Sequence, residues 1–133
     1  MESTQPWWHE LNHFSFGDSP KMADELAALV VQRIKCGTSW LVSEGQQTQV
    51  GQQHVVLDGQ GRPVAVIETT ELRQVRFCDV DAQFAYDSGE EDRSLEKWRA
   101  GYRRYYEQQG KFDPTMVLYC ERFTLVDVIT EED

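Results

Sequence analysis

The chain of 133 residues contains little cysteine and no long apolar run. Its three cysteines, Cys36, Cys78 and Cys120, are an odd number without a CxxC pair, so the sequence predicts neither a disulfide framework nor a zinc ribbon. No apolar stretch approaches the roughly 20 residues that a transmembrane helix needs. The first residues, MESTQPWWHE, lack the basic start and apolar stretch of a secretory signal. We therefore expect a cytoplasmic protein with reduced thiols and no membrane contact.

Positive charge is also scarce. The 13 lysines and arginines face 23 acidic residues, which gives a formal net charge of -10 at pH 7. Such a charge repels polyanions over long range and argues against duplex DNA as a partner. It leaves room for a local basic surface.

What the sequence does contain is enough apolar material for one folded unit. A hydrophobic content of 40% and an aromatic content of 11% are typical of a globular protein, and this length suffices for a single core. We expect one domain over residues 1–133, with an N-terminal extension over 1–15, a mobile Gln-rich loop over 43–53 and an acidic tail over 130–133.

Apolar spacing predicts the helices. Apolar residues at i, i+4 and i+7 indicate a short helix over residues 7–14. A second helix is expected over 20–34, because Ser19 is a good N-cap and is followed by proline. Residues 79–87 are expected to add one or two helical turns, and 95–109 to form a third main helix.

Runs rich in β-branched and aromatic residues predict the strands. Residues 40–42 indicate a short strand, and 54–58 with 63–70 a hairpin whose second strand extends towards residue 77. A long final strand is expected within 115–129. This order lacks the regular strand-helix alternation of a parallel sheet, so we expect an α+β fold with a small mixed or antiparallel sheet packed by helices.

Several motifs, in one order along the chain, resemble the ASCH domain family. They are a Pro-started helix ending in Lys-x-x-Thr at Lys35 and Thr38, then VIETTE from Val66, FAYDSGEEDRSLEKWR from Phe84 and CERF from Cys120. The resemblance covers nearly the whole chain. It implies a small PUA-like β-barrel flanked by helices, with one helix beside a cleft.

The resemblance also implies a class of ligand. Members of the family are associated with RNA, and relatives include ribonucleases and an amidohydrolase that deacetylates acetylated cytidine. The expected partner is therefore single-stranded RNA, a nucleotide or a nucleoside, and no cofactor is expected. A ribonuclease, a nucleoside amidohydrolase and a non-catalytic RNA-binding regulatory module all stay open, because fold transfers more safely than activity.

The same resemblance proposes catalytic residues. The lysine, threonine and glutamate of the amidohydrolase relatives correspond to Lys35, Thr38 and either Glu90 or Glu91. A threonine hydroxyl needs a base to become a nucleophile, and a lysine can be that base only when its surroundings disfavour its charged form. In phosphodiester cleavage, Lys35 would instead stay charged against the phosphorane. The alternative is structural, because a lysine in the last turn of a helix is favoured by the dipole.

Two arginines are candidates for ligand binding. Arg99 and Arg103 flank the apolar stripe of the third helix, and we expect their guanidinium groups to reach a neighbouring cleft and contact phosphate. An outer basic stripe is expected to face solvent, and it consists of Arg93, Lys97 and Arg104.

Trp40 and Glu68 complete the ligand-binding candidates. Glu68 and Glu121 each interrupt an apolar strand run. An inward carboxylate must be paired or poised for chemistry, so the favoured interpretation of both is an outward position or an ion pair with Arg122 or Arg99.

The segment His9-Glu10-Leu11-Asn12-His13 matches the zinc motif H-E-x-x-H. A zinc site also needs a third ligand, and a longer helix than the glycine and proline at 17–20 allow. We therefore expect no metal site at His9 and His13.

Overall fold

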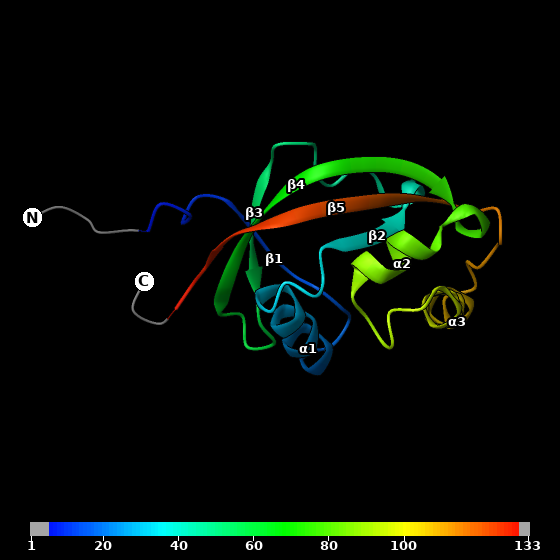
Figure 1. The fold of residues 1–133 in the computed structure, drawn as a ribbon, viewed down its shortest axis with the longest axis horizontal. Coiled ribbons are helices and arrows are strands. Elements are labelled where there is room, and N and C mark those ends of the chain that lie inside the picture. Colours follow the sequence, from blue (N-terminus) through cyan, green and yellow to red (C-terminus); the bar gives the residue numbers. More distant parts are fainter. Residues whose placement is uncertain (1–5, 131–133) are drawn as a thin grey trace, which may run out of the picture.

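The structure is a computed structural model that describes residues 6–130. Within this range the chain forms five strands and three α-helices (Figure 1). In chain order they are β1 (Asn12–Ser15), α1 (Pro20–Val31), β2 (Gly37–Leu41), β3 (Gln53–Leu57), β4 (Pro63–Arg76), α2 (Ala82–Ser88), α3 (Leu95–Gln108) and β5 (Val117–Val128). Two short 3-10 turns, Val42–Glu44 and Phe77–Asp79, follow β2 and β4.

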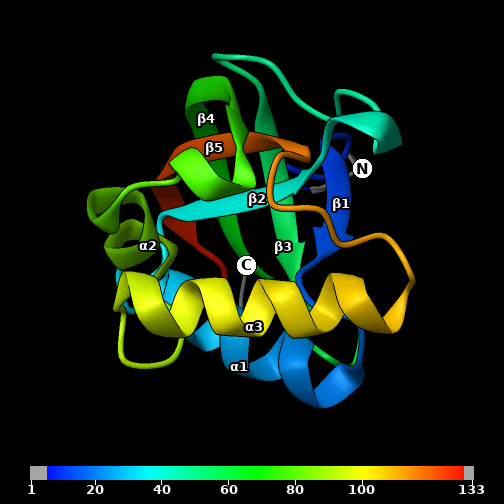
Figure 2. The same ribbon diagram turned by 90° about the vertical axis from the view of Figure 1, so that its right-hand side faces the viewer.

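The strands form one sheet in the order β1-β3-β4-β5-β2. The β1–β3 pair is parallel and the other pairs are antiparallel. The long strands β4 and β5 pair along almost their whole length, and two bulges in this pairing help to bend the sheet. The result is a curled half-barrel with α1 and α3 below it (Figure 2). The α+β class and the barrel-like, mixed sheet predicted from the sequence are confirmed.

Helix α1 begins as predicted but ends earlier. The Ser19 hydroxyl accepts a hydrogen bond from the backbone N–H of Met22, and Pro20 is the first helical residue. At the other end Arg33 adopts a positive φ of 65°, and the N–H groups of Arg33 and Ile34 bond back to the carbonyls of Val30 and Leu29. This pattern is a Schellman motif, which terminates the helix at Val31. Lys35 is therefore not in the last helical turn but in the segment between α1 and β2.

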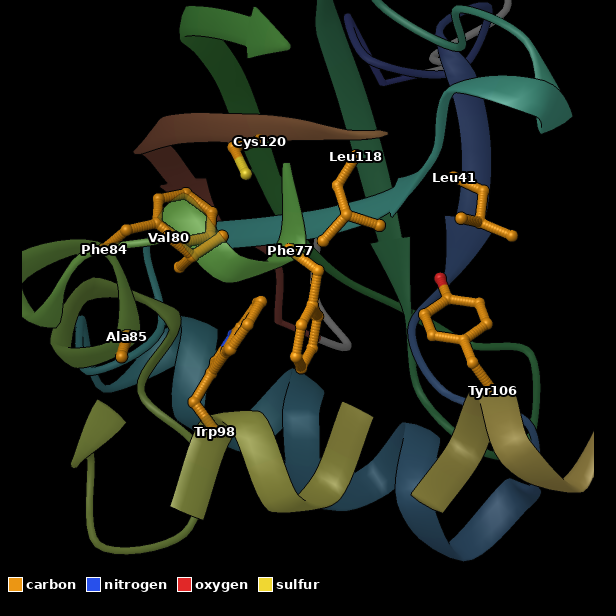
Figure 3. Close-up of a cluster of buried hydrophobic side chains, with 9 residues drawn as sticks. All are labelled: Leu41, Phe77, Val80, Phe84, Ala85, Trp98, Tyr106, Leu118 and Cys120. Atoms are coloured by element: carbon orange, nitrogen blue, oxygen red, sulfur yellow. The ribbon is translucent and has the colours of Figure 1, made fainter. Parts of the chain in front are cut away.

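Two apolar clusters hold the helices on the sheet. Helix α1 packs Leu26, Ala27 and Val30 against Phe123 of β5 and neighbouring strands. A second cluster joins α2 and α3 to β2 and β5, with the Phe77 and Trp98 rings stacked at 5.6 Å between centroids (Figure 3). Together these clusters fix α1 and α3 relative to β2.

The predicted N-terminal helix over residues 7–14 is wrong. Residues 7–10 form a turn, and β1 pairs with β3 in register from Asn12–His54 to Ser15–Leu57. The stretch assigned to an extension therefore contributes an edge strand to the sheet. The tail at 131–133 lies outside the described residues, and in the described part no helix is long and apolar enough to cross a membrane.

The Gln-rich segment after β2 is mostly exposed, but it is attached to the sheet. Thr48 is buried, Gly51 N–H donates to the carbonyl of Thr69, and Gln53 already belongs to β3.

Candidate functional site

A cavity of about 390 Å³ lies between α1, β2 and α3. Its aromatic lining consists of Phe16, Trp40, Trp98, Tyr102, Tyr105 and Tyr106. Its charged lining consists of Asp18, Lys35, Glu44, Glu90, Glu91, Lys97 and Arg104. Thr38 and Ser39 add hydroxyl groups from β2. This volume falls in the range of about 300–1,000 Å³ that is typical of small-molecule sites.

Lys35 is the most unusual residue of the lining, because only 1% of it is exposed. Its Nζ donates to the carbonyls of Gly37 at 2.7 Å and Ser88 at 3.2 Å, and to Glu90 Oε2 at 2.9 Å. An ammonium group has three donors, so these three oxygens occupy all of them. The geometry describes a charged ammonium ion, which stabilises negative charge, rather than a free amine.

The structure brings five predicted residues to this cavity: Lys35, Thr38, Trp40, Glu90 and Glu91. Glu90 is the acid in contact with Lys35, whereas Glu91 is exposed at a positive φ of 54° and makes no hydrogen bond or ion pair among the described residues. Among those residues, the Thr38 hydroxyl likewise has no hydrogen-bond partner. Lys35, Thr38 and Glu90 are thus polar members of one lining, and Lys35 and Glu90 are in direct contact.

Aromatic rings provide the remaining walls. The Trp40 and Tyr119 ring centroids are 5.4 Å apart, and the indole N–H of Trp40 donates to the Gly45 carbonyl at 2.8 Å. On α3, the Trp98 and Tyr102 ring centroids are 4.5 Å apart. Burial, and to a lesser degree Glu90, raises the pKa of Tyr102 above its ordinary value of 10, so its hydroxyl is neutral at physiological pH. Such walls can hold a flat ring by stacking.

Three of the predicted ligand-binding residues lie elsewhere. Arg99 donates to the carbonyls of Cys78 and Val80, and Arg103 pairs with Glu107 at 3.0 Å. Glu68 accepts a hydrogen bond from Gln53, its partner across the sheet.

The apolar stripe of α3 has two edges: Arg99 and Arg103 lie along one, and the cavity lies along the other. The residues on the cavity side are Lys97, Gly101 and Arg104. The sequence predicted that Lys97 and Arg104 would face solvent. Positions 97, 101 and 104 follow i, i+4, i+7 spacing, and the missing side chain of Gly101 leaves the space open.

Glu121 is buried, contrary to the expected outward position or ion pair. It is 5% exposed and faces Thr38 across the β2–β5 pair. Arg122, the expected partner, instead pairs with Glu71 and Asp87. Burial raises the pKa of Glu121, and hydrogen bonding from Thr69 and the charge of Lys35 oppose that shift. The register that places Glu121 beside Thr38 was not visible in the sequence.

A buried hydrogen-bond chain runs from Glu121 to the sheet edge. Thr69 Oγ1 donates to Glu121 Oε2 at 2.7 Å, Thr48 lies 2.8 Å from both Thr69 and His54 Nε2, and Asn12 Nδ2 contacts His54 Nδ1 at 3.1 Å. An amide nitrogen only donates and a carboxylate only accepts. Every bond in the chain therefore points from Asn12 towards Glu121, and this direction requires a neutral His54 that carries its proton on Nε2.

We expect His54 to make the protein less stable in mild acid. Burial lowers the pKa of His54 below its ordinary value of 6.5, so the unfolded state binds the proton more tightly. The contribution of neutral His54 to the free energy of unfolding is complete above the pKa that His54 has in the unfolded state. It is lost as the pH falls from there towards the lower pKa of the folded state. Urea unfolding of wild type and His54→Gln should show a stability difference that shrinks below about pH 6.5. A difference independent of pH would contradict this assignment.

The H-E-x-x-H segment is not helical. His9 lies in a turn and His13 in β1, so the two imidazoles do not share a helical face. His13 Nδ1 contacts the Leu11 carbonyl at 2.6 Å. In the described part of the chain, no group of three or more His, Cys, Asp or Glu side chains is arranged to bind a metal.

A curled five-stranded sheet and three helices define a small α+β half-barrel domain, with a ligand-sized cavity beside α1. The family model described as ASCH domain matches residues 12–127. The chain therefore belongs to the ASCH domain family, which is generally thought to bind RNA.

Solved structures agree with this family. An ASCH domain from Lactobacillus crispatus JV V101 is 28% identical, with a TM-score of 0.77 over 87% of this chain and 79% of that chain. Protein EF3133 from Enterococcus faecalis V583 is 31% identical, with a TM-score of 0.80 over 91% of this chain and 79% of that chain. A search of curated proteins finds no match.

Proposed function

We propose that this ASCH domain binds single-stranded RNA or a nucleoside by taking one base into the cavity between α1, β2 and α3. The observation that carries this proposal is the cavity lining, which combines the aromatic rings of Trp40, Trp98 and Tyr102 with the polar side chains of Lys35, Thr38 and Glu90. Aromatic walls suit the face of a base, and the polar group suits its hydrogen-bonding edge. A cytoplasmic location stays a prediction.

The charge of the lining indicates which part of a nucleotide enters. Three basic and four acidic side chains face the cavity, so the lining has no net positive charge. A phosphate gains no net attraction there, whereas an uncharged base or nucleoside meets no penalty. In an RNA strand, the phosphates would stay outside, within reach of the exposed Lys97 and Arg104.

Hydrolysis is the second candidate, and one observation favours it. Thr38 lines the cavity, its hydroxyl has no hydrogen-bond partner among the described residues, and the charge of Lys35 in the same lining can stabilise an oxyanion. This arrangement suits an acylated nucleoside better than a ribonuclease substrate, because the lining offers no excess positive charge for a phosphorane. Product analysis after incubation with N4-acetylcytidine and with single-stranded RNA distinguishes amidohydrolase, ribonuclease and binding alone.

We expect Gly101→Leu to block the cavity without harming the fold. Gly101 lines the cavity from α3, and a Cβ added there would meet no atom within 4 Å. The larger side chain should lower ligand affinity about tenfold or more by occupying the space of the base. Leucine is also a better helix former, so the free energy of unfolding should rise by about 0.5–1 kcal/mol.

Tryptophan fluorescence is a suitable measurement, because Trp40 and Trp98 both line the cavity. Cytidine, adenosine, N4-acetylcytidine and a short single-stranded RNA of mixed sequence serve as probes. Ala100→Leu is the matched control, since Ala100 is exposed on the same helix and does not line the cavity. Wild-type affinity in Gly101→Leu, or no binding of any probe by wild type, would refute the proposed site.

A further inference from the structure

Glu121 is a buried carboxylate without an ion-pair partner among the described residues. It is 5% exposed, and its only hydrogen bond in that part of the chain comes from the neutral hydroxyl of Thr69, at 2.7 Å on Oε2. The other oxygen, Oε1, has no hydrogen-bond partner there. Buried carboxylates are normally paired with a cation or bonded by several donors, so this arrangement disfavours the charged form.

The nearest cation does not resolve this imbalance. Lys35 lowers the pKa of Glu121 through its charge, but this effect is smaller than the opposing effect of burial. All three donors of Lys35 are occupied by Gly37, Ser88 and Glu90, so none is left to bond Glu121. Lys35 thus already has its counter-ion in Glu90.

Glu121 lies directly behind the cavity wall. Thr38 lines the cavity, and Thr38 and Glu121 are opposite partners in the antiparallel β2–β5 pair. Opposite side chains in such a pair lie on the same face, with Cβ atoms about 4.5–5.5 Å apart. A ligand seated against Thr38 would therefore replace water one side chain away from Glu121.

We propose that Glu121 takes up a proton when the cavity is filled, so that ligand binding and protonation of this side chain are coupled. Because the proposal concerns the same cavity, it rests on the proposed function. Loss of water penalises the carboxylate and not the neutral acid. The proton can reside on Oε1, which leaves the hydrogen bond from Thr69 to Oε2 intact. Binding of an uncharged base and binding of an anionic nucleotide both favour this uptake.

The other ionisable groups near Glu121 are few. Lys35 precedes β2, Glu90 lies beyond Lys35, and His54 of β3 is connected to Glu121 through Thr48 and Thr69. Glu90 contacts the cation Lys35, which favours its charged form. A proton on both nitrogens of His54 would place two donors, His54 Nδ1 and Asn12 Nδ2, against each other, which disfavours protonation of His54. Among these groups, Glu121 is therefore the buried one whose charged form has the fewest partners.

Calorimetry tests the coupling with the full chain. Binding of cytidine, N4-acetylcytidine and a short single-stranded RNA is measured in buffers of different ionisation enthalpy, which gives the number of protons taken up. Wild-type affinity should rise as the pH falls from about 7.5 to about 5.5, by at most about tenfold per pH unit, with uptake of up to about one proton. Glu121→Gln should bind without this uptake and with little pH dependence. Glu68→Gln, a half-buried sheet carboxylate outside the cavity, should behave as wild type.

A stability measurement separates this role from a structural one. The raised pKa of Glu121 means that the folded protein binds this proton more tightly than the unfolded chain, in which the pKa of the side chain is near 4.5. The free energy of unfolding of wild type therefore decreases as the pH rises from about 4.5 through the pKa that Glu121 has in the folded protein. Glu121→Gln avoids this loss, so its stability relative to wild type should increase with pH.

The outcomes distinguish the two proposals. If neither wild type nor Glu121→Gln binds any probe, the proposed function fails and the coupling fails with it. If both bind with the same proton uptake, or if Glu90→Gln or His54→Gln abolishes the uptake while Glu121→Gln retains it, only the assignment to Glu121 is overturned.

Discussion

Replacing Lys35 with alanine should lower the free energy of unfolding by about 3 kcal/mol. The substitution removes an ammonium group that is 1% exposed and leaves the carbonyls of Gly37 and Ser88 without their donor. It also removes the counter-ion of Glu90. This loss of about 3 kcal/mol is at the low end of the range for a broken buried ion pair. The reason is that 26% of the Glu90 side chain is exposed, so water can solvate the carboxylate once Lys35 is removed.

Lys97→Ala is the control for this experiment. Lys97 lines the same cavity but is exposed, so its removal should change stability by less than about 0.5 kcal/mol. Urea unfolding of both variants gives the comparison. Equal stability of Lys35→Ala and wild type would show that Lys35 is solvated in solution. Loss of ligand binding in Lys35→Ala can be assigned to the site only under conditions in which that variant remains folded.

The expected cost of Lys35→Ala shows what the sequence could and could not predict about this residue. The sequence correctly placed Lys35 and Thr38 where a helix gives way to a strand, but it put Lys35 in the last helical turn, and α1 ends at Val31. A lysine in a helix end would contribute only about 0.3–1 kcal/mol through the dipole. The contacts that bury Lys35 come from Ser88 and Glu90, more than 50 residues further along the chain, so no local pattern reveals them.

The elements that the sequence predicted well have long, regular patterns. The final strand within 115–129 is found as β5, and the helix expected over 95–109 is found as α3, with its end one residue earlier. The false helix over 7–14 rested on three apolar residues. It was wrong because β1 gains its hydrogen bonds from β3, which lies about 40 residues away in the sequence.

The candidate site was predicted where a motif carried it and missed where tertiary register decides it. The motif could not choose between Glu90 and Glu91, and it is Glu90 that contacts Lys35. Helical periodicity located the apolar stripe of α3 but not which edge of the stripe faces the cavity. Strand alternation likewise could not place Glu121 opposite Thr38, because this placement depends on the β2–β5 register.

Gly89→Ala should be the most disruptive small substitution near the site. Gly89 ends α2 with a positive φ of 74°, which costs a residue with a side chain about 1–2 kcal/mol. A Cβ at this position would also lie 2.6 Å from the Ile34 carbonyl oxygen and 2.7 Å from Lys35 Cα. Both atoms belong to the backbone, so they cannot move aside as a flexible side chain would. We expect a loss of about 2–4 kcal/mol in the free energy of unfolding.

Gly61→Ala separates the two causes of this loss. Gly61 has a similar φ of 78°, but a Cβ there would meet no atom within 4 Å. It should therefore show only the conformational cost of about 1–2 kcal/mol. The excess loss in Gly89→Ala measures how tightly the end of α2 packs on the segment that carries Lys35.

Because Gly89 lies between Ser88 and Glu90, both of which bind Lys35, relief of the clash must displace at least one of these contacts. Gly89→Ala should then weaken binding of any ligand that Gly101→Leu excludes, even at temperatures where the variant is folded. Equal stability of Gly89→Ala and Gly61→Ala, with ligand affinity unchanged, would show that the two segments are not packed as described.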